Sequence, residues 1–216
     1  MELGTMISQL CGGMITSTEI FVLTLVFSLP LGLVVAFGRM SKIAPIRWLS
    51  KVYISIMRGT PLMLQLMVVY FGPYYIFGAR ISSGYRMTAV LIGFAINYAA
   101  YFAEIYRGGI ESISAGQYEA AKVLGYTKTQ TFFRIIFPQV MKRILPSITN
   151  EVITLVKDTS LSFVIAIPEM FTIAKQIAAA QTSMTAFIAA GIFYYVFNLI
   201  VAFVMEAIEN KMNYYR

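Results

Sequence analysis

The sequence predicts an all-α membrane protein with five transmembrane helices in a single domain, residues 1–216. Hydrophobic residues make up 58% of the chain and charged residues only 12%, about half the charged share of an average soluble domain. The length supports the same prediction, because 216 residues hold about five apolar spans of ~20 residues once loops are subtracted.

The residue inventory excludes several kinds of site. Cys11 is the only cysteine and histidine is absent, so neither an intramolecular disulfide nor a metal site of the Cys/His type is expected. No GxxxxGK sequence followed by Ser or Thr occurs, so the chain is not expected to bind ATP through such a phosphate-binding loop. The net charge of +7 is expected to face anionic lipid headgroups and not nucleic acid.

The first three predicted spans cover residues 14–37, 53–77 and 87–106. Pro30 lies inside the first span, where membrane helices tolerate proline and can bend. A basic stretch between the first two spans predicts a short segment at the membrane surface, with Arg39, Lys42, Arg47 and Lys51.

The last two predicted spans cover residues 144–167 and 184–205. The fourth span is unusual, because Lys157 and Asp158 lie within it and a lipid-facing helix does not tolerate such polarity. We therefore expect this span to face protein or water. The residues that follow it, from Pro168, predict a short external helix at the surface.

The longest polar insertion lies in the predicted cytoplasmic loop 107–143 and predicts two short helices. Gly125 can adopt the left-handed conformation that ends the first helix, and the second is expected to end before Pro138. A capping box, in which two side chains satisfy free backbone N–H groups, fits the start of each helix: Ser114 with Gln117, and Thr127 with Gln130.

Basic residues predict that the amino terminus is outside and the carboxyl terminus cytoplasmic. In that orientation the cytoplasmic side holds the basic stretch at 39–51, the loop 107–143, and the tail with Lys211 and Arg216. The external segments then hold only Arg80, Arg86 and Lys175. The reverse orientation would contradict the positive-inside rule.

Several groups of residues resemble the membrane subunits of ABC importers. The spaced group Glu119-Ala120-Ala121, Gly125, Ile135 and Pro138 resembles the EAA loop of that family, with Phe137 where leucine is usual. Three further blocks are similar to the polar amino acid branch: Met57 to Leu62 with Gln65, Ala103 to Ile110, and Lys157 to Leu161. Together they cover most of residues 57–161.

The resemblance implies a type I ABC importer permease fold and ATP-driven translocation of a polar amino acid across the bacterial plasma membrane. The chain itself is not expected to be an enzyme, because ATP and Mg would bind a partner subunit. The implied partners are ATP-binding subunits, an extracellular or periplasmic solute-binding protein, and a second permease chain that is identical or similar. The implied contact with the ATP-binding subunit comprises Gln117, Glu119, Ala120, Ala121, Leu124 and Gly125.

Two other functions remain open from the residues alone. An ion-gradient-driven carrier or channel for small solutes would work without a partner ATPase, and a non-transporting membrane scaffold would not need polar side chains in its spans. The helices of the 107–143 loop could also form a DNA-binding helix-turn-helix, but their short tethers to two spans keep them out of a major groove.

Polar side chains of the third span are candidates for a substrate pathway. Asn97, Tyr101 and Glu104 share one face of this helix, roughly opposite a stripe of alanines at 95, 99 and 103 that suits close helix packing. A polar face inside a membrane must meet protein or water. The alternative is a network of hydrogen bonds between helices, with Glu104 paired to Arg107.

The fourth span offers a second group of pathway candidates. Lys157 and Asp158 point ~100° apart on a helix, so either the helix breaks here or each side chain finds a separate partner. We expect Lys157 and Asp158 to form a gate or structural ion pairs, and a broken helix here could bind a polar solute with its freed backbone groups. The side chains expected to line the pathway are Thr159, Ser160 and Ser162.

Glu19 is a lone carboxylate in the first span, near its external end. Its side chain can extend to the membrane surface. Alternatively, it pairs with a cationic side chain on the substrate, which would favour arginine, lysine or histidine.

Overall fold

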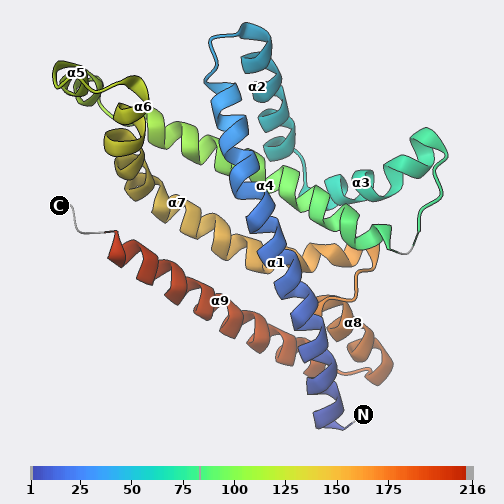
Figure 1. The fold of residues 1–216 in the computed structure, drawn as a ribbon. Coiled ribbons are helices and arrows are strands. Elements are labelled where there is room, and N and C mark those ends of the chain that lie inside the picture. Colours follow the sequence, from blue (N-terminus) through green and yellow to red (C-terminus); the bar gives the residue numbers. More distant parts are fainter. Residues whose placement is uncertain (1, 83, 213–216) are drawn as a thin grey trace.

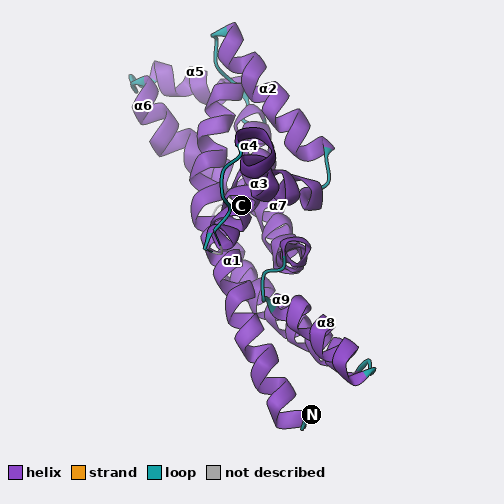
Figure 2. Cartoon of the chain, turned by 90° about the vertical axis from the view of Figure 1, so that its right-hand side faces the viewer, coloured by secondary structure: helices purple, strands orange, loops and turns teal. Residues whose placement is uncertain are grey.

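The computed structural model describes residues 2–82 and 84–212, and every regular element in those ranges is helical (Figure 2). The all-α prediction is therefore confirmed, whereas Arg216 of the predicted cytoplasmic tail lies outside the described residues. The elements are α1 (Leu3–Arg39), α2 (Ala44–Gly59), α3 (Leu62–Phe77), α4 (Tyr85–Glu111), α5 (Ala115–Val123), α6 (Lys128–Gln130), a π-helical turn η1 (Thr131–Ile136), α7 (Phe137–Asp158), a 3-10 segment η2 (Thr159–Ile165), α8 (Met170–Gln181) and α9 (Thr185–Lys211).

Three of the described helices, α1, α4 and α9, are long and apolar enough to cross a membrane. Two bent pairs raise the number of candidate spans to five: α2 with α3, which meet at 110°, and the helix 128–165 with α8, which meet at 58°. The predicted spans thus correspond to helices of different length. The first begins near Leu3 and not near residue 14, and the second is divided between α2 and α3.

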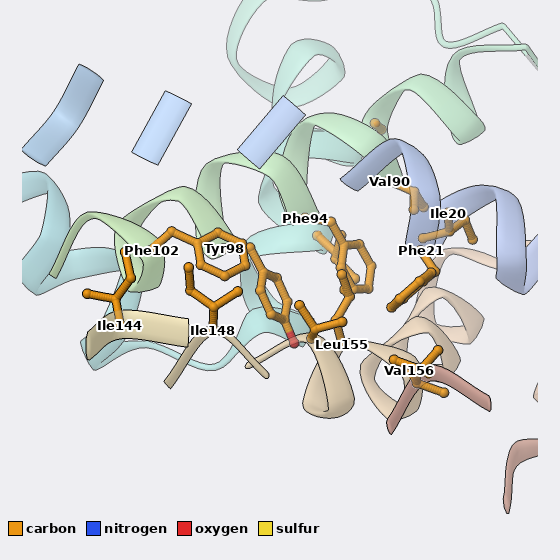
Figure 3. Packing of buried hydrophobic residues seen from close by; sticks show 14 of the residues in the cluster. Ile20, Phe21, Val90, Phe94, Tyr98, Phe102, Ile144, Ile148, Leu155 and Val156 are labelled. Carbon is orange, nitrogen blue, oxygen red and sulfur yellow. The ribbon is translucent and has the colours of Figure 1, made fainter. Parts of the chain in front are cut away.

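Helix α4 lies at the centre of the fold and packs against α1, α2, α3 and α7 (Figure 1). Its largest buried side chains are Phe94, Tyr98 and Phe102. Figure 3 shows these rings beside Ile148 and Leu155, which belong to the segment containing α7. The apolar core of the chain therefore forms around α4, and the other helices are positioned relative to it.

Helix α1 approaches the stripe of small residues on α4 closely. Ala99 and Ala103 are fully buried, and a Cβ atom built on Gly32 of α1 would lie 2.8 Å from Phe102 Cβ and 3.0 Å from the Ala99 carbonyl oxygen. Small residues allow two membrane helices to pack with their backbones in contact, which is the main source of attraction between helices in lipid.

The second helix of the 107–143 loop does not end before Pro138, contrary to the prediction. The backbone stays helical from Lys128 through η1 into α7. Within η1 the Phe137 N–H donates to the Phe132 carbonyl, five residues back. This wider π-helical turn shifts the hydrogen-bond register just before the proline, so the missing N–H and bulky ring of Pro138 are accommodated without a break.

The short helix predicted after Pro168 is present as α8, but one face of it is buried. Glu169 is fully buried and caps the helix, accepting hydrogen bonds from the N–H groups of Phe171 and Thr172 at 2.7 Å each. Tyr194 of α9 donates a further bond to Glu169, at 3.0 Å. Because α8 also packs against α1, it lies between two spans and is not simply laid on the surface.

We predict that Gly32→Ala lowers the melting temperature of the protein in detergent. The added methyl group would force α1 away from α4, and overpacking of this kind costs about 1–3 kcal/mol. Gly12→Ala is the matched control, because it lies on the same helix and a Cβ atom built there has nothing within 4 Å. Equal melting temperatures for the two variants would contradict the close packing of α1 on α4.

Candidate functional site

Helix α5 carries the residues expected to contact an ATP-binding subunit, and it projects from the bundle at the end opposite α8 (Figures 1 and 2). Gln117, Glu119 and Ala120 are exposed, and Leu124 just after the helix is 73% exposed. Ala121 alone among the expected contact residues is buried, at 1% exposure. The helix therefore offers one free face, while Ala121 lies against the rest of the chain.

Gly125 closes α5 as predicted, with a φ angle of 77°. The N–H of Gly125 donates to the Lys122 carbonyl at 3.1 Å, and the N–H of Tyr126 donates to the Ala121 carbonyl at 3.0 Å. These two bonds form a Schellman motif, which satisfies the last carbonyls of a helix and favours glycine at the left-handed position. The chain can thus reverse direction directly after α5.

The capping box predicted at Ser114 and Gln117 is wrong, because Ser114 makes no side-chain bond to the start of α5. The Gln117 side chain instead accepts a hydrogen bond from Gln139 of α7 at 3.2 Å. The second predicted box is confirmed: the Gln130 N–H donates to Thr127 Oγ1 at 3.2 Å, and the Thr127 N–H donates to Gln130 Oε1 at 2.9 Å. Gln117 therefore links α5 to α7.

Asn97 lies at the break between α2 and α3, in a network of hydrogen bonds between helices. Its Nδ2 donates to the Met57 carbonyl at 3.0 Å and to Gln65 Oε1 at 2.9 Å. Gln65 Nε2 donates to the same Met57 carbonyl at 3.0 Å and to the Thr60 carbonyl at 3.1 Å. Both side chains are buried, at 4% exposure for Asn97 and 8% for Gln65. We call Gln65 and Asn97 the amide clamp.

The other two polar residues of the α4 face have different surroundings. The ring of half-buried Tyr101 lies under the guanidinium of Arg58, whose carbon is 5.3 Å from the ring centroid. Glu104 accepts hydrogen bonds from Arg107 Nη2 at 2.6 Å and Nε at 3.1 Å, which is the pairing weighed as its alternative role. The Arg39 Nε lies 4.0 Å from Glu104 as well.

Lys157 and Asp158 lie where α7 ends and η2 begins, and the described residues contain no ion pair between the two side chains. Asp158 accepts a hydrogen bond from Tyr98 of α4 at 2.7 Å, whereas Lys157 is exposed. The helix passes from α to 3-10 geometry here and does not break, and only Asp158 takes a partner on another helix.

The hydroxyl side chains of η2 differ in exposure. Thr159 and Ser162 are fully buried within the chain, and Ser160 is half-buried. Thr159 donates to the Val156 carbonyl at 2.8 Å and Ser160 to the Lys157 carbonyl at 2.7 Å. Ser162 Oγ is the one hydroxyl of η2 that has no hydrogen-bond partner in the part of the chain that the structure describes. Their place in a pathway stays a prediction.

Glu19 is exposed on α1 and lines an open cavity of about 470 Å³ with Cys11, Thr18 and Phe193. Residues 2–82 and 84–212 provide no ion pair for its carboxylate. The cavity is otherwise lined mainly by apolar side chains, from Met14, Ile15 and Val22. Such a position accepts a cationic or amide group more readily than an anion.

A model of the family described as "Binding-protein-dependent transport system inner membrane component" matches residues 28–214. The chain belongs to this family. It is 35% identical to the L-cystine transport system permease protein TcyB of Bacillus subtilis (strain 168), with 95% of this chain and 87% of TcyB covered. It is 37% identical to the arginine transport system permease protein ArtQ of the same organism, with 93% and 90% covered.

Solved structures have the same architecture as this inner membrane component. One chain, from the "Crystal structure of an amino acid ABC transporter with histidines", superposes with a TM-score of 0.86 at 31% identity, covering 98% of this chain and 99% of that one. A chain of the MetNI methionine ABC transporter superposes with a TM-score of 0.78 at 18% identity, covering 99% and 100%, and shows the fold alone. The expected type I ABC importer permease fold is therefore confirmed.

Tyr98 and Arg58 were not among the predicted site residues. Arg58 belongs to the block from Met57 to Leu62 that carries the resemblance, and Tyr98 is adjacent to the candidate Asn97. Tyr98 binds Asp158, and Arg58 lies over Tyr101. Tyr98 was obscured by its aromatic neighbours, which indicate core packing. An arginine inside a predicted span is the signal that could have drawn attention to Arg58.

We predict that Tyr98→Phe destabilises this inner membrane component by about 1–3 kcal/mol, because the half-buried Asp158 carboxylate would lose its hydroxyl donor. Thermal unfolding in detergent measures the effect. Tyr101→Phe is the control, because the Tyr101 hydroxyl has no hydrogen-bond partner among residues 2–82 and 84–212 and its ring is retained. A Tyr98→Phe variant as stable as Tyr101→Phe would contradict the bond to Asp158.

Proposed function

We propose that this chain is the permease subunit of an ATP-driven ABC importer that translocates a polar amino acid. The observation that carries the proposal is α5, a short helix with an exposed face that projects from a membrane bundle and is bonded to α7 through Gln117 and Gln139. Relatives named as amino-acid transport permeases, among them TcyB and ArtQ, support the substrate class.

The proposed assembly places two ATP-binding subunits in the cytoplasm, with ATP and Mg bound there, and a solute-binding protein outside. The amino terminus would be external and the carboxyl terminus cytoplasmic, as the basic residues predict. A second permease chain, identical or similar, would complete the pathway in the bacterial plasma membrane. The exposed residues Val123 and Leu124 of this chain, at 88% and 73%, suit a protein partner better than water.

Coupling in this proposal runs along one continuous helical segment. A displacement of α5 would reach Gln139 directly, and Gln139 lies near the start of α7 itself. The far end of α7 holds Lys157 and Asp158. The substrate pathway would pass this end of α7 and the polar face of α4, with Glu104, Thr159, Ser160 and Ser162 beside it.

The rival functions fit the chain less well. A gradient-driven carrier or channel has no use for an exposed helix that projects from the bundle, and a scaffold has no use for the buried polar contacts of α4 and α7. Co-purification decides between them. The chain should be recovered with an ATPase and should support amino acid uptake only when ATP is present; recovery alone, with uptake driven by an ion gradient, would refute the importer.

We predict that Glu119→Lys lowers transport-linked ATPase activity by on the order of tenfold or more, which corresponds to at least about 1.4 kcal/mol of coupling free energy. The reason is that the reversed charge lies on the exposed face of α5. The assay compares ATP hydrolysis with and without the solute-binding protein and substrate, in vesicles containing equal amounts of inserted chain.

The control for Glu119→Lys is Glu206→Lys, an identical charge reversal at an exposed position of α9. It should retain coupled hydrolysis. Normal coupling in Glu119→Lys would show that α5 does not contact the motor subunit at this residue.

We also predict that Glu19→Gln selectively weakens uptake of cationic amino acids if the carboxylate meets a substrate side chain. Removing the charge would raise the KM for arginine and lysine by about tenfold, because an opposite charge is lost in a partly apolar cavity, and would leave the KM for glutamine unchanged. Uptake measured side by side for the three amino acids gives the answer. An unchanged KM for arginine would leave Glu19 as a surface carboxylate.

A further inference from the structure

Arg58 is a cation inside a predicted membrane span, residues 53–77. It lies at the end of α2, where its guanidinium carbon lies over the ring of Tyr101 of α4. Tyr101 lies about 8 Å of helix before Tyr106 and about 21 Å of helix after Met87, the two ends of the predicted third span. Arg58 therefore lies inside the span, nearer the end that leads into the 107–143 loop, where an arginine is costly unless it meets water, backbone carbonyls or an anion.

No carboxylate in the part of the chain that the structure describes lies within 4.0 Å of Arg58. Glu104, one turn away from Tyr101, is engaged by Arg107 through three hydrogen bonds. Arg58 is exposed and donates no hydrogen bond to residues 2–82 or 84–212. Within the described residues Arg58 therefore has no ion pair, although the carboxylates of Glu104 and Glu151 lie near enough to interact with its charge.

The contact with Tyr101 holds the guanidinium over the ring without using its hydrogen-bond donors. A guanidinium that lies over an aromatic ring keeps its N–H groups in its own plane. Those groups form the planar fork that binds a carboxylate with two parallel hydrogen bonds. The observed contact at 5.3 Å therefore prepares Arg58 for a planar anion and does not satisfy it.

The amide clamp fixes the backbone that carries Arg58. Met57 and Thr60, which flank Arg58 and Gly59, accept four hydrogen bonds from the side chains of Gln65 and Asn97, three of them at backbone carbonyls. These bonds replace helical ones that the 110° turn between α2 and α3 removes. The buried carboxamides of Gln65 and Asn97 thus both bind the backbone between Met57 and Thr60. Arg58 is the charged residue of that segment.

We propose that Arg58 binds the carboxylate of the transported amino acid, and that Gln65 and Asn97 are positioning residues that hold Arg58 in place. This inference rests on the proposed function, and it names the chemical group that all substrates of the class share. Side-chain differences among polar amino acids do not alter their α-carboxylate, so one arginine serves each of them.

The test measures substrate binding by the complex of this chain with its ATP-binding subunits, purified in detergent. The probes are radiolabelled L-arginine, L-glutamine and L-cystine, measured by equilibrium dialysis. Arg58→Met should raise the Kd at least about tenfold for each probe that the wild-type complex binds. The Kd of Arg58→Lys should lie between those of the wild type and Arg58→Met, because lysine keeps the positive charge but lacks the planar fork of N–H donors.

Lys51→Met is the matched control, because it removes a positive charge from an exposed position of the same helix. It should leave the Kd unchanged. An unlabelled competitor provides an independent measurement: L-argininamide, which lacks the carboxylate, should compete much more weakly than L-arginine against wild type and equally with it against Arg58→Met.

Asn97→Leu tests the positioning role. It should raise the Kd in the wild-type background and add nothing in the Arg58→Met background, since residues that act through one another are not additive. Gln65→Met gives the same comparison if Asn97→Leu does not fold. If Asn97→Leu raised the Kd by the same factor in the wild-type and Arg58→Met backgrounds, the amide clamp would have only a structural role.

Three outcomes would overturn the role of Arg58: an unchanged Kd in Arg58→Met, equal competition by L-argininamide and L-arginine against wild type, or no saturable binding by the wild-type complex. None of these outcomes depends on ATP-driven uptake by the wild-type chain, which tests the importer itself. The two proposals can therefore fail separately.

Discussion

Every backbone polar group within a bilayer must find its hydrogen bond inside the protein, and the rest of this fold depends on how that constraint is met where α2 turns into α3. Pro61 has no N–H and begins α3 as its cap, so the carbonyls at the end of α2 lose their helical partners. Gln65 and Asn97 supply the missing donors from two other helices. These hydrogen bonds hold the turn in place. The turn also places the polar side chains of Arg58 and Gln65 against α4.

Helix α4 can serve as the common support because its faces differ in size and polarity. Its small residues, such as Ala99, let α1 approach with backbone contact, while Phe94 and Phe102 fill the space around α7 (Figure 3). The remaining face carries Asn97 and Tyr101, which contact the end of α2. Helix α4 is therefore packed on several sides by α1, α2, α3 and α7.

The geometry of α7 joins two regions that are far apart in the molecule. At one end, Gln139 holds α5 through Gln117, and at the other, Asp158 is bound to Tyr98 of α4. Helix α7 stays continuous between these two residues, although Pro146 lies inside it. Under the proposed function, a push on α5 from the cytoplasm is therefore transmitted along one element to the polar contacts beside the pathway.

The sequence by itself determined the features that depend on local chemistry: an all-helical membrane chain, the capping box at Thr127, and the left-handed glycine at the end of α5, because hydropathy and short spacings fix these within a few residues. Only the tertiary structure decided which partner each polar side chain takes. Gln117 does not cap α5 as predicted but accepts a hydrogen bond from Gln139 of α7, and Asn97 donates to the Met57 carbonyl, forty residues away in the chain. In a bilayer, a polar group is stabilised by the donor or acceptor that helix packing brings within hydrogen-bonding distance. Local sequence patterns do not determine which helices pack together, so they cannot predict that partner.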